Sequence, residues 1–278
     1  MEINIGVEEI IELQSAFSPE QIREKALAKR ADAFGQMAKF IQRPKPEDIE
    51  ISATQKRLEP FWYAAATARY VYERRHTFHV PVAPEVQSVT LYGSEHPANG
   101  DKNHSIALDG VERCVEEFHQ ELFLDAQRGN PGKFDKYVSF SKIAVAEAAA
   151  LERDGTLAVA PEVRGSFVVR KLVSLLMKTF QADRVLEEKI DVTQVALYYR
   201  PVFAVEYCWQ AKDKKQVLEF DGLTGEVKME NGELKKKVVN VLENDALFDI
   251  GADVAGTLFP GVNVAVKLGR LAARKAIK

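Results

Sequence analysis

Cysteine and histidine are both scarce in this chain. Two cysteines, Cys114 and Cys208, and five histidines occur among its 278 residues. Two cysteines are too few for a disulfide framework and suit a reducing compartment. Zinc sites need three or four converging nitrogen, sulfur or oxygen ligands. The composition therefore excludes a disulfide-rich scaffold and leaves few side chains for a metal centre.

Long apolar runs are also missing. No segment reaches the roughly 18 to 20 apolar residues that a membrane-spanning helix requires. The first residues, MEINIGVEEIIELQ, carry acids where a signal peptide carries basic residues. With 46% hydrophobic and 28% charged residues, the chain has the composition of a globular protein of one or two domains. We expect a cytoplasmic protein, with a peripheral membrane association left open.

Neither a strong charge nor a catalytic motif is present. The net charge is −3 and the pI is near 6.0, whereas proteins that coat nucleic acid are broadly basic. No phosphate-binding glycine loop, G-x-S-x-G elbow or H-E-x-x-H helix occurs. Carboxylates are plentiful, but no spacing selects an acid and base pair. The sequence thus predicts no catalytic residue, no cofactor and no metal ion.

The clearest local pattern lies at residues 196–229, ALYYRPVFAVEYCWQAKDKKQVLEFDGLTGEVKM. Strand side chains alternate with period two, so one face collects Phe203, Val205, Tyr207 and Trp209. A polar reversal follows, then a second strand and a tight turn at Asp221, whose side chain we expect to bond nearby backbone amides. This pattern predicts an antiparallel meander with one core face.

The segment VLEFDGLTGEV resembles the last strand of PepSY domains. These are small cystatin-like modules that end in a V-x-V-D-x-x-T-G-x-V hairpin. Modules of that family are mainly inhibitory or accessory and occur in propeptides of thermolysin-type peptidases. The resemblance implies binding rather than chemistry, and it carries over no catalytic residues.

A helix followed by strands is predicted twice. Residues 19–42 form an amphipathic stripe with Ser18 as N-cap, and Trp62, Ala64, Ala66, Ala68, Tyr70 and Tyr72 then alternate on one strand face. Residues 161–220 repeat this order with a second helix that is apolar almost all round. With a single-residue gap, Pro19 aligns with Pro161 and Pro60 with Pro201.

This register predicts an α+β fold of two duplicated units, each with one helix and an antiparallel β-meander, followed by a helical tail. We place the first unit at 1–140 with a β extension at 85–125, the second at 141–232 and the tail at 233–278. The segment LFLDAQRGNPG is a degraded echo of LEFDGLTGEV. Residues 142–152 have high helix propensity and are expected to connect the units.

The few candidate reactive side chains do not form a recognisable motif. Cys114 and His119 lie close in sequence and would need partners such as His96 or His104 for a zinc or Cys-His site. His76 and His79 form H-x-x-H, but on a strand this spacing points the rings to opposite faces. A structural cysteine and surface histidines are the simpler interpretation.

An aromatic and arginine cluster lies on the strand at 61–75, comprising Trp62, Tyr63, Arg69, Tyr70, Tyr72, Arg74 and Arg75. Exposed aromatic side chains flanked by cations can stack on nucleic-acid bases. The alternation instead indicates that one set packs beneath the helix. Nucleic-acid binding is therefore an alternative that depends on whether Trp62 or Tyr63 faces solvent.

The end of the chain carries no acid after Asp253. On a helix from about residue 263, four cations would gather on one side. This helix predicts binding to a protein partner or weakly to an anionic membrane. The candidate binding residues are Lys267, Arg270, Arg274, Lys275 and Lys278.

The function expected from these patterns is that of a non-enzymatic binding or adaptor protein built from two PepSY-like modules. The first alternative is a hydrolase with a pocket between the two halves, using Cys114, His119 and nearby acids. The second alternative is nucleic-acid binding through the strand at 61–75. The sequence leaves the partner and the oligomeric state open.

Overall fold

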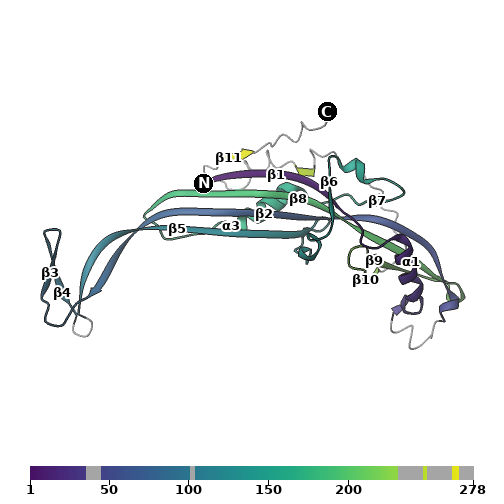
Figure 1. Cartoon of the computed structure of the whole chain (residues 1–278), viewed down its shortest axis with the longest axis horizontal. Helices are drawn as coiled ribbons and strands as arrows, with labels where there is room; N and C mark the ends of the chain where they lie inside the picture. The colour runs from purple at the N-terminus through teal and green to yellow at the C-terminus, as the bar shows by residue number, and fades with distance from the viewer. Residues whose placement is uncertain (36–44, 101–103, 231–246, 249–264, 269–278) are drawn as a thin grey trace.

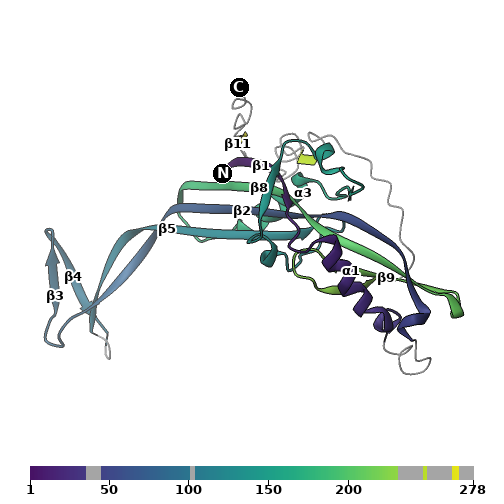
Figure 2. The ribbon, with the colours of Figure 1, turned by 45° about the vertical axis from the view of Figure 1, so that its right-hand side comes forward.

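Long β-strands dominate the architecture of the protein. The computed structural model describes residues 1–35, 45–100, 104–230, 247–248 and 265–268. In this part of the chain the strands form an 11-stranded network whose main path runs β10-β9-β8-β2-β5-β4-β3. Figures 1 and 2 show an elongated, arched molecule rather than a rounded one.

Three strands run along the arch. β2 (Ile49–Pro81) has 33 residues and lies between β5 (Ser105–Asp125) and β8 (Arg184–Trp209), antiparallel to both (Figure 1). Shorter strands attach to this group: β1 (Glu2–Leu13), β3 (Ser88–Leu91), β4 (Ser94–Asn99), β6 (Lys142–Val145), β7 (Leu157–Ala158), β9 (Lys214–Asp221), β10 (Val227–Glu230) and β11 (Ala265–Leu268). Among them, β1 pairs with β8 in parallel.

The main core lies between the centre of the sheet and α3 (Gly165–Leu176). The alternating small and aromatic side chains of β2 supply its floor, as the sequence predicts, because one strand face is apolar from Trp62 to Tyr70. α3 packs Val168, Val169, Leu172 and Val173 onto that floor. The opposite side of α3 is exposed at Leu175. The helix is therefore covered on one side only, although its apolar sequence suggested burial on all sides.

A second core lies at the other end of β8, beneath α1 (Pro19–Ala28). Ser18 caps α1 in a capping box with Gln21, which confirms the predicted N-cap. Ile22 and Ala26 of α1 pack on a strand face that includes Phe203, Val205, Tyr207 and Trp209. Figure 2 shows α1 beside β9, away from α3. The predicted meander at 196–229 is present here as β8, β9 and β10.

The predicted fold class is nevertheless wrong. The two predicted units do not each carry a separate helix and meander, because β2 and β8 pair with one another along one mixed sheet. Strands of residues 1–140 and of residues 141–232 therefore belong to the same sheet. Alternation reveals which side chains share a strand face, but it does not reveal which strand lies alongside.

The structure explains the matching positions of Pro60 and Pro201 without a duplication. Pro60 lies on β2 between Leu58, where pairing with β7 ends, and Phe61, where pairing with β5 begins. Pro201 lies on β8 between Tyr199, the last partner of β1, and Val202, the first partner of β9. Proline lacks an N–H, so it fits where the neighbouring strand changes. Each proline marks such a change.

Several predicted helical segments also differ. α1 ends at Ala28, and α3 begins at Gly165 rather than at Pro161. The expected connector helix at 142–152 is β6 followed by one short 3-10 turn. Residues 265–268 of the predicted helical tail form β11, parallel to β1. The 3-10 segments are Arg30–Asp32, Pro46–Asp48, Asp135–Tyr137, Ala148–Leu151 and Gln210–Lys212.

Three large aromatic residues predicted to be core are buried. Trp62 and Tyr207 have 0% exposure and Trp209 has 3%. Trp62 also donates a hydrogen bond to the Val163 carbonyl at 2.8 Å, and the Tyr207 hydroxyl donates to the Ala26 carbonyl at 2.9 Å. These residues tie both cores to the long strands.

We predict that replacing Trp62, Tyr207 or Trp209 by alanine lowers the free energy of unfolding by about 3–5 kcal/mol, because a large cavity remains. Urea unfolding of the purified variants measures this. Val111→Ala, at a position 64% exposed on β5, is the control and should cost less than about 1 kcal/mol. Equal losses in all four variants would contradict the assigned cores.

Candidate functional site

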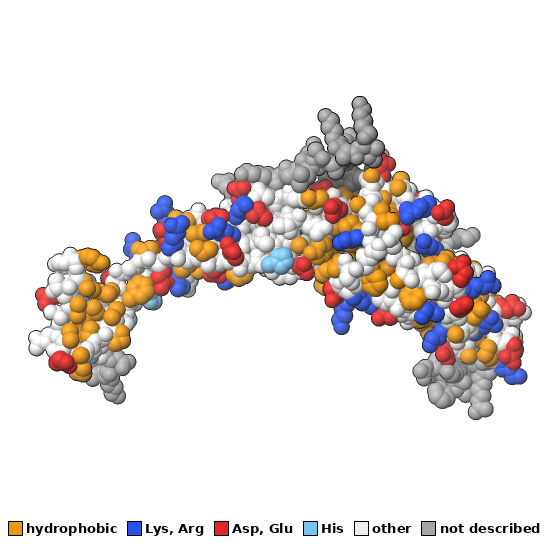
Figure 3. Space-filling view, in the orientation of Figure 1, with side chains coloured by type: hydrophobic (Ala, Val, Ile, Leu, Met, Phe, Trp, Pro, Cys, Tyr) orange, Lys and Arg blue, Asp and Glu red, His pale blue; other side chains and the backbone are white. Residues whose placement is uncertain are grey.

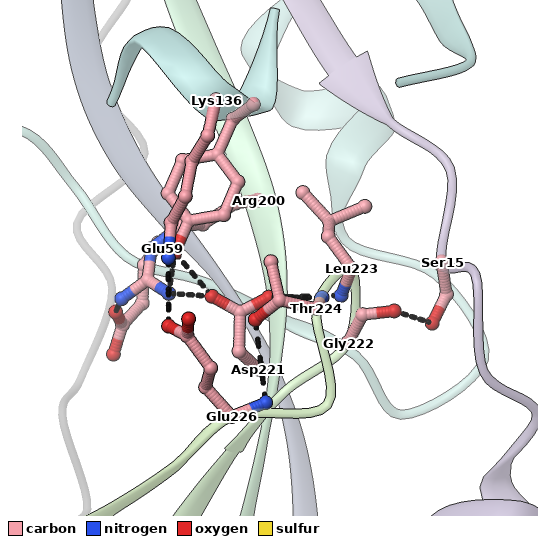
Figure 4. Close-up of polar contacts among 10 residues, drawn as sticks. Ser15, Glu59, Lys136, Arg200, Asp221, Gly222, Leu223, Thr224 and Glu226 are labelled. Carbon is pink, nitrogen blue, oxygen red and sulfur yellow. Dashed lines mark hydrogen bonds and ion pairs between the residues drawn. The ribbon is translucent and has the colours of Figure 1, made fainter. Parts of the chain in front are cut away.

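A buried polar cluster occupies the middle of the sheet (Figure 4). Arg200 of β8 donates to Asp221 at 2.8 Å and to Glu59 of β2 at 2.5 Å. The hydroxyl of Tyr137 donates to the same Asp221 oxygen, and the Arg200 guanidinium lies 5.5 Å from the Tyr137 ring centre. Glu59 and Arg200 are direct cross-strand neighbours. The cluster thus joins β2, β8, the end of β9 and the 3-10 turn at 135–137.

The turn after Asp221 completes the cluster. The second carboxylate oxygen of Asp221 accepts hydrogen bonds from the backbone amides of Leu223 and Thr224. This confirms the predicted role of Asp221 as a turn residue. The next residue, Gly222, lies where a Cβ would be 2.9 Å from the Pro201 carbonyl oxygen. Its own carbonyl accepts from the Ser15 hydroxyl and the Ala16 amide, which attaches the segment before α1.

Protonation in this cluster is fixed by its surroundings. Burial alone would raise the pKa of the Asp221 carboxyl, but hydrogen bonds from Tyr137 and the turn amides, with the Arg200 charge, hold it below its usual value. Burial and the bond to Asp221 raise the pKa of the Tyr137 hydroxyl. Burial would lower the pKa of Arg200, but its anionic neighbours keep it raised. The carboxylate stays ionised and the phenol stays neutral.

This arrangement is structural rather than reactive. Tyr137 and Asp221 are buried, and the carboxylate already accepts bonds from four groups. A buried ion pair whose polar atoms are satisfied holds its chain segments in one arrangement. No atom of Asp221 remains to accept a proton from a substrate. We therefore assign the cluster to positioning the strands.

The side chains of the predicted Cys-His pair do not meet. Cys114 and His119 both lie on β5, where an odd spacing places them on opposite faces. Their separation along the strand is about 16 Å at the usual rise per residue. His96 lies on β4, and His104 directly precedes Ser105, the first residue of β5. The structure therefore brings none of the four together.

His76 and His79 lie on β2, opposite Gly110 and Ala107 of β5. Within the residues that the structure describes, no three His, Cys, Asp or Glu side chains are grouped as metal ligands would be. His104 instead has a local role, because its Nε2 atom donates to the Val86 carbonyl at 2.7 Å.

The aromatic and arginine strand at 61–75 is not an open stacking surface. Trp62, Tyr70 and Tyr72 are buried, and Tyr63 is half-buried with its hydroxyl bonded to Glu121 at 2.9 Å. That bond, after burial, raises the pKa of Tyr63 to about 12.

The side chains of two arginines on this strand, Arg69 and Arg74, are held by acidic partners. Arg69 lies 3.4 Å from Glu117, and Arg74 lies 2.5 Å from Glu112. The backbone amide of Arg75 donates to Asp183. Because the aromatic rings are buried or half-buried and two of the arginines are paired, this strand offers no flat array of exposed rings for bases to stack on.

Of the five candidate binding residues in the predicted tail, only Lys267 lies in the described part of the chain. Lys267 belongs to β11, where its backbone is opposite Asn4 of β1. Arg270, Arg274, Lys275 and Lys278 lie outside the described residues.

Sequence reasoning missed a protruding arm. Beyond Glu73, the last residue opposite β8, β2 continues with β5 as its partner, and this two-stranded ribbon carries the β3–β4 hairpin. We call residues 74–100 and 104–112 the arm; it projects at the left of Figure 1. Every residue of β2 from Arg74 to Pro81 is exposed. Figure 3 shows hydrophobic side chains gathered on its far part.

The arm ends in Tyr92, whose side chain is fully exposed. Tyr92 has φ 52° and Gly93 has φ 83°, so the hairpin closes with two left-handed residues, as type I′ turns do. Asn or Gly normally fills the first of these positions, because a Cβ is disfavoured there. A large aromatic ring is therefore held out at the tip at some cost in backbone energy.

The sequence contained part of this signal. The alternation in VQSVTLYG correctly predicts β3, and Tyr-Gly is the turn. The following segment SEHPANGDKNH is rich in turn formers and predicts a loop at 94–104. That prediction misses β4, because Pro97 and Asn99 here lie on a short outer strand. Nothing local shows that the ribbon leaves the body, since that depends on where β8 begins.

Comparisons with protein-family models, curated proteins and solved structures give no match. In the described part of the chain, no helix has both the length and the apolar character needed to cross a membrane.

We predict that Asp221→Asn lowers the free energy of unfolding at pH 7 by about 3 kcal/mol, because Arg200 loses its buried anion and keeps only the half-buried Glu59. The folded pKa of Asp221 lies below its usual 3.8, so its stabilisation is complete above that value and is lost as pH falls through the folded pKa. The difference between wild type and variant should therefore shrink below pH 3.8. Urea unfolding at several pH values measures it.

The matched control is Glu226→Gln, because Glu226 pairs with Lys136 at 2.7 Å in the same region but is 57% exposed. This change should cost less than about 1 kcal/mol. A wild-type-to-Asn difference that stays constant from neutral to acid pH would show that Asp221 does not act through its charge.

Proposed function

We propose that this chain is a non-enzymatic binding protein that holds a protein partner with its arm. The observation that carries this proposal is the fully exposed Tyr92 at the end of a ribbon that adds nothing to either core. Exposed aromatic residues in a protruding, preformed loop are typical centres of protein recognition. The sequence also predicted a binding or adaptor role, but it assigned binding to the cations of the tail, whereas this proposal assigns it to the arm.

The backbone at the tip supports this choice. A tyrosine in the left-handed region costs about 1 kcal/mol relative to glycine, and an isolated two-stranded hairpin is marginal in water. Phe78 and Val80, each 40% exposed, and Val111 add apolar surface along the same arm. Neither the strain nor the exposure helps the chain fold, so both are explained by contact with another molecule.

A protein fits the arm better than an anionic membrane does. Between Val82 and Gly100 the chain has no lysine or arginine, while it contains Glu85 and Glu95. Such a segment is not attracted to anionic lipid headgroups. We propose a cytoplasmic location, which the two free thiols of Cys114 and Cys208 support. Weak binding to an anionic membrane remains a prediction for the cations of the tail alone.

The first experiment maps the contact. A photoreactive phenylalanine analogue replaces Tyr92 in cells, and mass spectrometry identifies the crosslinked protein. The same analogue at Thr67, an exposed residue on β2 in the body, is the control. We expect a specific protein adduct at position 92 that is absent at position 67. Equal adducts at both positions would contradict recognition by the arm.

We predict that Tyr92→Asn weakens binding of that partner by about tenfold or more, because an aromatic anchor is lost. Asparagine suits the left-handed turn, so the free energy of unfolding should stay the same or rise slightly. Calorimetry with the purified partner and urea unfolding measure the two effects. An unchanged dissociation constant would refute the proposal.

A matched deletion separates the arm from the body. Arg74 and Glu112 are directly opposite, so an Asn-Gly turn between them can replace residues 75–111 and close the hairpin. This variant should keep cooperative unfolding and lose the partner. Retained binding would place the contact on the body instead.

A further inference from the structure

The backbone of β5 has an outer edge whose orientation can be read from its two ends. At one end the Phe123 carbonyl accepts from the Gly132 amide, and the Asp125 amide donates to Asn130, both on the side away from β2. At the other end the His104 carbonyl accepts from Val82, on the β2 side. Because backbone groups alternate along a strand, the odd-numbered residues of β5 point their N–H and C=O groups outward.

Most of this edge has no neighbouring strand. β4 pairs only with Ser105 and Ile106, and the chain after β5 returns at Phe123. Between these points no strand of the described chain pairs with the outer side of β5, as Figure 1 shows for the lower border of the arch. One outward carbonyl, that of Glu121, is satisfied by a side chain, because the Gln120 amide donates to it at 2.7 Å. We call the stretch from Asp109 to Glu121 the open edge.

The open edge lacks the usual structural defences of an edge strand. β5 contains no proline, and its pairing with β2 continues without a register shift from Ser105 to Asp125. Edge strands are normally short, bulged or covered, because a row of free N–H and C=O groups accepts another strand. Added strands are also a common way for proteins to bind extended peptides.

Charge on the open edge is mainly negative. The stretch contains the acids Asp109, Glu112, Glu116, Glu117 and Glu121 and a single cation from Lys and Arg, Arg113. Three of the acids have a Lys or Arg partner elsewhere: Glu112 pairs with Arg74, Glu116 with Lys178 and Glu117 with Arg69.

The carboxylates near the two ends of the open edge are different. Asp109 accepts from the Thr77 hydroxyl, and Glu121 accepts from Tyr63 with His119 3.8 Å away. In the described chain neither has a Lys or Arg partner. Both belong to the same exposed strand face, so they favour a cationic neighbour there.

We infer that the open edge binds an extended, lysine- or arginine-bearing segment of a partner protein as an added β-strand. This inference rests on the proposed binding function and assigns it a second surface and a ligand chemistry. Main-chain hydrogen bonds to the outward groups hold the segment. Its basic side chains lie beside Asp109 and Glu121, which selects basic segments over acidic ones.

A second copy of this chain fits the open edge less well. Figures 1 and 3 show that the arm and the α1 end both bend toward the β5 side, so the edge lies in a concave border. Two antiparallel copies joined along it would direct each bent end into the other molecule. A single extended segment follows the curvature without this conflict.

The test uses a substitution that removes one outward donor. Val115 is odd-numbered and 53% exposed, so Val115→Pro deletes an N–H that bonds to no strand of the described chain. Val115→Thr at the same position keeps that N–H and is the matched control. The probe is a fluorescent, end-blocked peptide of about ten residues in which lysine alternates with valine and threonine.

We expect the full-length wild type and Val115→Thr to bind this probe equally in fluorescence anisotropy. Val115→Pro should bind it about tenfold more weakly, because a main-chain bond is lost and the ring obstructs the added strand. Glu121→Gln should weaken binding and reduce its salt dependence. Equal affinity for Val115→Pro and wild type would overturn the inference.

Amide hydrogen exchange by NMR gives a second readout that charge alone would not produce. Bound probe should protect alternate amides of β5, namely those of Asp109, Val111, Arg113, Val115, Glu117 and His119. Protection of neighbouring even-numbered amides should not change. A probe N-methylated at alternate residues should bind weakly, and full retention of its affinity would overturn strand addition in favour of simple charge attraction.

Two controls separate this inference from neighbouring ones. Tyr92→Asn should bind the lysine probe like wild type, so failure at the arm and failure at the open edge are distinguishable. Sedimentation velocity without probe tests the alternative occupant. A wild-type dimer that becomes monomeric in Val115→Pro would overturn the peptide assignment and give the edge to a second copy.

Discussion

Antiparallel pairing of β2 with β8 is the interaction on which the rest of the molecule depends. The register runs from Ile49 opposite Trp209 to Glu73 opposite Arg184 and shifts at three points. β5 then adds to β2, while β1 and β9 add to β8. α1 and α3 pack on side chains of these two strands. Arg200 and Glu59 fix the middle of the ladder with a direct ion pair.

The same ladder determines where the surface is free to bind. β2 and β5 are both longer than the region that β8 supports, so their ends leave the body as a ribbon. β5 also has a partner on one side along most of its length. The arm therefore arises from a mismatch in strand length, and the open edge arises because β5 is the last long strand on its side of the sheet. Binding surfaces built in this way need no pocket, and their affinity comes from backbone groups and a few exposed side chains.

Local structure was predictable to the extent that its cause is local. Alternation correctly identified the buried face from Trp62 to Tyr70, and Ser18 as an N-cap before Pro19 correctly identified the start of α1. The echo of Asp221–Gly225 in Asp125–Gly129 is also real, because both segments close the same turn with an Asp side chain and a positive-φ glycine. Strand partners were not predictable, because pairing of Leu58 with Pro201 depends on residues far apart in sequence. The arm was missed for the same reason.

The parallel pairing of β1 with β8 has a consequence for synthesis. Ile3 lies opposite Ile190, and both side chains are completely buried. A ribosome adds about 5–20 residues per second, so β1 emerges about 10–40 s before its partner strand. Throughout that interval the backbone groups of β1 and its buried isoleucines lack the partners that β8 later supplies. The rate of translation through the first two thirds of this protein therefore sets how long the nascent chain is prone to association.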